Sequence, residues 1–257
     1  MFAKVSRLRP EMRDALKSKH QIYRFLAQIA IRSTLAYFWN WNYLILSILG
    51  IVIRRGWRVA ITVSDLGQDN ILLIDPDVME KSSARIVLKG SGNVLKIASQ
   101  CVLKSASIVL GSRCNVSLGE RSQLASIDIY CADECEIFVG RGVSCTWSSR
   151  LYAHEPSRIF IGDRCLIASD VSIMTSDMHT IYDVATGERI NKAQDIHIGE
   201  HVWLASSVKV MKGVKIGDNS VIGAASIVTS DVPNNCVAVG VPAKVVKEHT
   251  NWDIALR

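Results

Sequence analysis

The clearest candidate for chemistry in the sequence is His179, which stands where a regular six-residue repeat is interrupted. Ile173 and Ile198 both open repeat units, yet they are 25 positions apart; one unit accounts for 6 of these and leaves an insertion of 19. Loops that leave a rigid scaffold are where functional sites tend to be built. Imidazole, with an unperturbed pKa of about 6.5, is suited to accept a proton near neutral pH. His179 is therefore a candidate base; the alternative is a solvated or capping loop residue. Asp177, two positions earlier, either orients the imidazole or caps a turn.

The repeat itself predicts the elements that position His179. A period of six fits a short flat strand followed by a tight turn, wound into a coil, and fits neither an amphipathic helix nor a simple alternating strand. The aliphatic residue that opens each unit is predicted to point inward, and the small or β-branched fifth residue to point inward near a corner. Gly, Asn and Asp serve the turns. Clear units begin at Ile161, Ile167, Ile173, Ile198, Leu204, Val210, Ile216 and Ile222, and fainter ones at Ile97, Leu103, Leu118 and Val139.

Several stretches resemble the hexapeptide-repeat acyltransferases. Ile-Gly-Glu-His-Val-Trp at 198–203 and the Gly-rich stretches at 217–229 and 240–247 are similar to the galactoside and maltose acetyltransferase branch. Residues 175–179 and 186–191 are similar to enzymes that O-acetylate capsular or other surface polysaccharides. The resemblance covers 155–248, continues over 60–154 only as degenerate coils, and excludes 1–60. It implies a mainly β fold: a left-handed parallel β-helix over 61–248, with an N-terminal helical segment (1–60), a loop insertion near 176–195 and a C-terminal tail (249–257).

The same resemblance implies an acetyl-CoA-dependent O-acetyltransferase that acts on a sugar hydroxyl of a surface or capsular polysaccharide or its precursor. His179 would remove the hydroxyl proton as the oxygen attacks the thioester carbonyl, and would then protonate the departing thiolate. Trp203 would line the active site, where its indole N–H could hold the acyl carbonyl or the acceptor; the alternative is a surface aromatic that covers a corner. The chemistry requires no metal.

The residues implied to contact acetyl-CoA are Ser206, Ala224, Thr229, Lys244 and Lys247. At the first two, small side chains would let the backbone approach the pantetheine arm. The last three match positions near the nucleotide end, where Lys supplies charge to the phosphates but lacks the bidentate geometry of the Arg that relatives often carry. The implied assembly is a homotrimer in which the catalytic base faces the CoA slot of a neighbour. Weaker candidates for acceptor contacts are His154, Glu155, Tyr182 and Arg189.

Residues 1–60 differ from the rest of the chain in charge and aromatic content. They hold 11 Lys+Arg and 2 Asp+Glu, a balance of +9, whereas the remaining 197 residues hold 19 and 22, a balance of −3. Residues 11–32 show helical apolar spacing with a basic opposite face. Residues 35–53 are uncharged, but this length is marginal for crossing a bilayer. We expect helices that either contact an anionic membrane surface through 1–58 or pack on protein. The basic excess is therefore no sign of a nucleic-acid partner.

The seven cysteines are odd in number and contain no Cys-x-x-Cys pair, which disfavours a disulfide framework or a zinc ribbon. Buried thiols in a reducing compartment fit better. The first 14 residues lack the apolar core of a secretory signal. These features predict a protein of the cytoplasm, or one peripheral to the inner face of the cytoplasmic membrane.

Three other functions stay open on the sequence. One is a sugar-nucleotide N-acetyltransferase. Another is a zinc carbonic anhydrase on the same coil, which needs three convergent imidazoles. His179, His197 and His201 make it conceivable, but the latter two fall at outward turn positions of their units. The last is a non-catalytic scaffold whose N-terminal segment organises membrane-bound glycosyltransferases.

Overall fold

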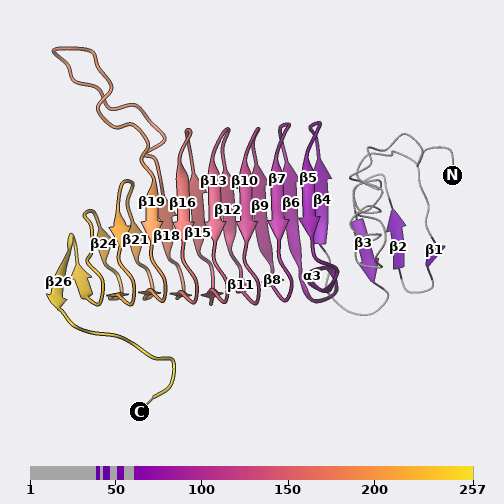
Figure 1. Ribbon diagram of the computed structural model, residues 1–257. Coiled ribbons are helices and arrows are strands. Elements are labelled where there is room, and N and C mark those ends of the chain that lie inside the picture. The colour runs from indigo at the N-terminus through magenta and orange to yellow at the C-terminus, as the bar shows by residue number, and fades with distance from the viewer. Residues whose placement is uncertain (1–38, 41–42, 47–50, 55–60, 257) are drawn as a thin grey trace, which may run out of the picture.

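The computed structural model describes residues 39–40, 43–46 and 51–54 as backbone and residues 61–256 with their side chains. The chain winds into a three-sided coil in which each turn contributes one short strand to each of three parallel sheets, here called sheets A, B and C (Figure 1). The predicted fold class, a mainly β, left-handed parallel β-helix, is confirmed.

The strands of the three sheets follow in spatial order. Sheet A contains β1 (Trp39–Asn40), β2 (Tyr43–Leu46), β3 (Ile51–Arg54), β4 (Ile61–Asp65), β6 (Ala84–Leu88), β9 (Ala106–Leu110), β12 (Asp128–Cys131), β15 (Arg150–Ala153), β18 (Ser172–Met174), β21 (Lys209–Val210) and β24 (Ile227–Val228). Sheet B contains β22 (Lys215–Ile216), β19 (Ile196–Ile198), β16 (Arg158–Ile161), β13 (Glu136–Val139), β10 (Asn115–Leu118), β7 (Val94–Ile97) and β5 (Ile71–Ile74). Sheet C contains β26 (Ala243–Lys247), β25 (Val237–Gly240), β23 (Val221–Ile222), β20 (Trp203–Leu204), β17 (Leu166–Ile167), β14 (Ser144–Cys145), β11 (Gln123–Ala125) and β8 (Val102–Lys104).

A short helix protects one end of sheet C. Helix α3 (Pro76–Lys81) lies between β5 and β6 in the chain, where the first coil would otherwise supply a strand next to β8 (Figure 1). Its Val78 is fully buried, and the following Ser82 accepts a hydrogen bond from the backbone N–H of Leu103 in β8 (2.9 Å). The helix therefore covers an edge that would otherwise expose unpaired backbone groups.

The N-terminal segment was predicted to be helical, and the ten residues of it that the structure describes are not. β1, β2 and β3 form an antiparallel ladder, with Leu44 opposite Ile53, and β3 meets β4 through Ile51 and Thr62. Aromatic and β-branched residues dominate these strands and favour extended backbone. The predicted helix over 11–32 lies outside the described residues. Within the described part of the chain, no helix is long and apolar enough to cross a bilayer.

The repeat unit behaves inside the coil as predicted. Opening residues of successive coils stack in register: Ile161 pairs with Ile198, and Ile198 with Ile216, all at most 1% exposed. Fifth-position residues such as Val202 and Ser220 are also buried. The core is thus assembled one layer at a time from aliphatic side chains, which provide most of the stabilisation of such a fold. All seven cysteines are free and buried, as predicted.

Glycine follows many opening residues because neighbouring coils approach closely there. A Cβ built on Gly162 would lie 2.6 Å from the backbone of Gly199 in the next coil. The left-handed backbone at these corners falls instead on later residues of the turn, including Arg164, His201 and Asn219 (φ 57°, 54° and 59°). The glycines therefore provide space between coils, and other residues adopt the turn conformation.

Coils differ in length on the two sides of the predicted insertion. In what we call the upstream coils (residues 61–175), Asp128 pairs with Arg150, 22 positions later; in the downstream coils (196–240), His197 pairs with Lys215, 18 positions later. The additional residues lie between sheets A and B, where Cys131 and Ile137 add a second inward layer at 0% and 1% exposure. Upstream coils are therefore wider at the A–B corner, and three hexads describe only the downstream coils.

Candidate active site

An arm leaves the coil at the A–B corner, between β18 and β19. Its two ends are anchored by inward side chains, Thr175 and Ile196, so the excursion comprises residues 176–195. It stands well clear of the coils (Figure 1). The arm folds back on itself as a small hairpin, in which the backbone N–H of Ile190 donates to the carbonyl of Ile181 (2.9 Å) and Tyr182 bridges Arg189. This hairpin carries His179 near its base.

Asn191 is the anchor of the arm's first turn, and it is only 6% exposed. Its Nδ2 donates to the carbonyl oxygen of His179 (2.7 Å) and to Oδ2 of Asp177 (2.9 Å), while its Oδ1 accepts from the N–H of Ile181 (2.7 Å). Lys212, from the next coil, donates its Nζ to Asp177 Oδ2 (2.5 Å) and to the carbonyl of Asn191 (3.0 Å). The hydrogen bond from Lys212 lowers the pKa of Asp177. The backbone of His179 is thereby fixed relative to the coil.

A second attachment holds the returning half of the arm. Arg189 makes a bidentate ion pair with Glu155 (2.7 and 2.8 Å), and Ser176 donates a hydrogen bond to the same carboxylate (2.6 Å). Both charged side chains are about two-thirds buried. Hydrogen bonds from Arg189 and Ser176, in that order, lower the pKa of Glu155 to about 2. Charge-assisted bidentate geometry makes this the stronger kind of ion pair.

His179 is held by its backbone and exposes its side chain. Its carbonyl is bound by Asn191, and the residue as a whole is exposed at the A–B corner. Asp177 accepts hydrogen bonds from the side chains of Lys212 and Asn191, so its carboxylate fastens the arm. An exposed imidazole on an anchored backbone can take a proton from a bound hydroxyl without reorganisation of the loop.

Trp203 lies on another side of the coil. It is half-buried on the outer face of β20 in sheet C, and its ring centroid is 5.8 Å from that of Trp252 in the C-terminal tail. Trp252 stacks on His201 (4.3 Å) and donates its Nε1–H to the His201 carbonyl (2.7 Å). Within one chain the structure therefore does not bring Trp203 together with His179, which belongs to the opposite A–B corner.

The five residues implied to contact acetyl-CoA lie in three places on the coil. Ser206 and Ala224 are exposed at the C–A corner in successive coils, joined by the N–H of Ala225 donating to the carbonyl of Ser206 (2.9 Å). Lys244 and Lys247 are exposed on β26, at the end of sheet C. Thr229 is exposed after β24, at the A–B side. Four of the five thus border sheet C, the side that carries Trp203.

The weaker acceptor candidates have different surroundings. Glu155 and Arg189 bind each other, so their side chains serve the arm. Tyr182 is 59% exposed on the hairpin. His154 stacks on Tyr130 (4.8 Å between centroids), and burial lowers its pKa. Asn191 and Lys212 were not predicted as anchors, because a buried asparagine in a polar loop and a lysine in a turn have no periodic signal.

The three histidines of the zinc alternative lie apart. His197 is exposed on sheet B and stacks on Phe160 (4.6 Å), whereas His201 is at the B–C corner with its Nδ1 3.2 Å from Oδ1 of Asn219. His179 is on the arm. Among the described residues, no group of three or more His, Cys, Asp or Glu side chains is arranged to hold a metal ion.

Comparison with known proteins gives matches over the coil. The family pattern "Bacterial transferase hexapeptide (six repeats)" matches residues 195–230. A polysialic acid O-acetyltransferase of Escherichia coli O1:K1 / APEC is 40% identical over 98 residues, which cover 38% of this chain and 32% of that protein. The polysialic acid O-acetyltransferase of Neisseria meningitidis is 31% identical over 152 residues, 58% of this chain and 69% of that protein.

A solved structure matches over a longer span. The crystal structure of the polySia specific acetyltransferase NeuO is 31% identical, with a TM-score of 0.69 over 76% of this chain and 83% of that one. The chain spans only 32% of the length of the Escherichia coli relative but 69% of the length of the Neisseria meningitidis relative.

Proposed function

Because the chain belongs to the hexapeptide-repeat acyltransferases, we propose that it transfers an acetyl group from acetyl-CoA to a sugar hydroxyl of a surface polysaccharide or its precursor. The observation that carries the proposal is His179, exposed on an arm that two separate attachments fix to the coil. The names of the relatives, which refer to polysialic acid, support a glycan acceptor.

In the proposed reaction His179 accepts the proton of the acceptor hydroxyl as its oxygen forms a bond to the acetyl carbonyl carbon. The carbon–sulfur bond then breaks, and the proton held by the imidazole passes to the departing thiolate of CoA. Trp203 contributes an indole N–H donor at the acyl group or the acceptor. Lys244 and Lys247 supply positive charge for the phosphates of acetyl-CoA, and Ser206 and Ala224 leave room for its pantetheine arm.

The separation of these residues supports a site made from two copies of the chain. His179 lies at the A–B corner, whereas Trp203, Ser206 and Ala224 lie on sheet C and the C–A corner. Two coils packed side by side, with the arm of one reaching the C–A corner of the next, would unite them. In a closed ring of three copies, the arm of each copy would reach the C–A corner of its neighbour.

The reaction is tested by release of free thiol from acetyl-CoA across a panel of sugars, sugar nucleotides and capsule oligosaccharides. His179→Ala is expected to lower kcat by about a hundredfold or more, the usual contribution of a general base. The matched control is His197→Ala, another exposed histidine, with activity expected within about twofold of the wild type. Unchanged activity of His179→Ala would exclude the proposed base. Equal loss in both variants would show that the loss is not specific to His179, and would contradict its role as the base.

The composite site is tested by complementation. At acetyl-CoA concentrations below the wild-type KM, His179→Ala and Ala224→Trp chains are each expected to have little activity as separate oligomers, and to regain activity when they are co-expressed and form mixed oligomers. Regain requires that an intact arm from one chain meet an intact corner of another. Mixed oligomers that stay inactive would contradict a shared site.

A further inference from the structure

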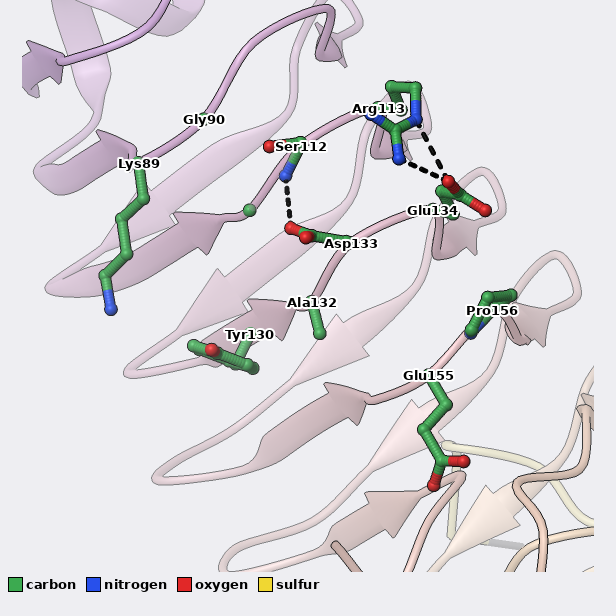
Figure 2. Close-up of a pocket in the computed structure, with 11 residues that line it drawn as sticks. Lys89, Gly90, Ser112, Arg113, Tyr130, Ala132, Asp133, Glu134, Glu155 and Pro156 are labelled. Atoms are coloured by element: carbon green, nitrogen blue, oxygen red, sulfur yellow. Dashed lines mark hydrogen bonds and ion pairs between the residues drawn. The ribbon is translucent and has the colours of Figure 1, made fainter.

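A groove on the outside of the upstream coils is not used by the proposed chemistry. It follows the A–B corner from the turn after β6 to the turn after β15 and has a volume of about 620 Å³. Figure 2 shows Lys89, Ser112, Asp133 and Glu155, from four successive coils, along this corner. Strands of one sheet are about 4.8 Å apart, so the groove extends over about 14 Å. It is therefore longer than a site for one sugar ring needs to be.

The middle of the groove presents an aromatic platform. One face of Tyr130 is covered by His154, stacked with centroids 4.8 Å apart, and its edge meets Tyr152 at 6.0 Å. Lys89 extends along the groove and places its Nζ over the Tyr130 ring, 5.7 Å from the centroid. The neighbouring rings fix the orientation of Tyr130. Rigid aromatic side chains offer large contact area at low conformational cost, and their faces suit the C–H faces of sugar rings.

Charges in the groove are nearly balanced. Arg113 pairs with Glu134, and Glu155 pairs with Arg189. Lys89 and Asp133 remain to face an occupant, and Oδ1 of Asp133 is oriented by the backbone N–H of Ser112 (2.7 Å). A carboxylate accepts hydrogen bonds and an ammonium donates them, and sugar hydroxyls do both. A polyanion would instead find no net positive field to attract it, because Lys89 and Arg113 are matched by Asp133 and Glu134.

The groove ends at the arm. Glu155 lines the groove and also fastens the arm through Arg189 and Ser176. His179 lies on this same arm, near its base. A chain lying in the groove would thus be directed along the A–B corner toward the arm that bears the proposed base.

From this geometry we infer that the groove binds the acceptor glycan itself, as a run of several uncharged, hydroxyl-rich sugar units. Tyr130 is the stacking platform, and Asp133 and Lys89 are the hydrogen-bonding groups. The inference rests on the proposed function and narrows it: the acceptor is a polymer whose bound part is neutral, in contrast to the polysialic acid in the names of the relatives.

The test compares acceptor kinetics for wild type and Tyr130→Ala with neutral oligomers of glucose, galactose and mannose of increasing length, and with polysialic acid. For the best neutral acceptor, KM is expected to fall with chain length and to change little with salt. Tyr130→Ala is expected to raise this KM about tenfold, which corresponds to about 1.4 kcal/mol of lost stacking, with kcat within about twofold. Tyr130→Phe keeps the ring and should behave as wild type. Phe138→Ala, which removes an exposed ring from sheet B in the same coil, is the matched control.

Several outcomes would overturn the inference. They are an unchanged KM in a Tyr130→Ala protein with wild-type melting temperature, a preference for polysialic acid with a KM that rises steeply with salt, and loss of oligomerisation with unaltered KM. The last would make the groove a contact between copies. If the wild type transfers acetyl to no glycan, the proposed function fails; calorimetric binding of the neutral oligomers to wild type but not to Tyr130→Ala would still support the groove.

Discussion

Upstream and downstream coils share one construction and differ at single corners. At the A–B corner, upstream coils have a second inward layer and a groove outside it, whereas downstream coils turn with a single hexad. At the C–A corner a single upstream coil differs. The position taken by Ser206 and Ala224 downstream is occupied by Ser169 in the last upstream coil and by Trp147, which is 62% exposed, in the coil before it. The arm lies where the two kinds of coil meet.

This division suggests that each half of the coil serves one substrate. The wide corner upstream makes room for a long polar ligand, and the small residues downstream keep the C–A corner open for a narrow one. The exposed side chain of Trp147 ends the row of small residues at the C–A corner. If this division holds, substitutions in one half should impair the binding of one substrate and leave the binding of the other unchanged.

The largest effect is expected at the downstream corner. Ala224→Trp places a bulky ring where the pantetheine arm is proposed to lie, and should raise KM for acetyl-CoA by about tenfold to a hundredfold. Trp147→Ala, at the same corner position three coils earlier, should leave this KM within about twofold. Initial rates at saturating acceptor measure both. An equal response of the two variants would show that the corner is not divided in this way.

The junction of the two kinds of coil should be sensitive to added volume. Gly162→Ala puts a Cβ 2.6 Å from the backbone of Gly199, and is expected to lower the free energy of unfolding by about 1–3 kcal/mol. Gly142→Ala has a backbone φ of +64° but its nearest neighbour is a side-chain carbon 3.8 Å away, so only about 1 kcal/mol is expected. Denaturant unfolding measures both. A larger loss at Gly142 would show that turn conformation matters more than coil spacing.

The arm should loosen in acid. The pKa of Glu155 in the folded protein, about 2, lies below its unfolded value of about 4.3. The stabilisation from its ion pair with Arg189 is therefore fully present above about pH 4.3 and is lost as pH falls through 2. Hydrogen exchange at Ile181 and Ile190, corrected for intrinsic rates, should accelerate over this range relative to the downstream coils.

The control for the acid effect is Glu155→Gln. This variant should show faster exchange in the arm already at neutral pH and a weaker acid dependence. If exchange in the variant equals that of the wild type, the ion pair does not hold the arm.

Removal of residues 1–56 is expected to have the smallest effect on the coils. We propose that the basic N-terminal segment binds an anionic membrane surface, so its removal should abolish co-sedimentation with vesicles containing anionic lipid. Activity on a soluble acceptor should be retained, because the candidate site residues, from Lys89 in the groove to Lys247, all lie beyond residue 60. Unchanged sedimentation would contradict the membrane contact, and complete loss of soluble activity would show that the segment supports the coil.

The sequence by itself determined the coil. Residues such as Ile161, Ile198 and Ile216 recur at a fixed period, and a period is visible without knowing what each residue contacts. The interruption of that period located the arm and His179. The helix over residues 11–32 stays a prediction. The strand Tyr43–Leu46 shows that, in a short segment rich in aromatic residues, the spacing of apolar residues does not by itself distinguish a helix from a strand.

Only the tertiary structure decided which side chains meet. Glu155 and Arg189 are 34 positions apart, and Lys212 is 35 positions from Asp177, so neither pair leaves a trace in local sequence. The wide A–B corner, with its groove beside Tyr130, depends on upstream coils that keep no hexad there. Periodic contacts within a layer are encoded by spacing. Contacts between an arm and a neighbouring coil depend on the winding of the whole chain, which brings distant residues to one corner.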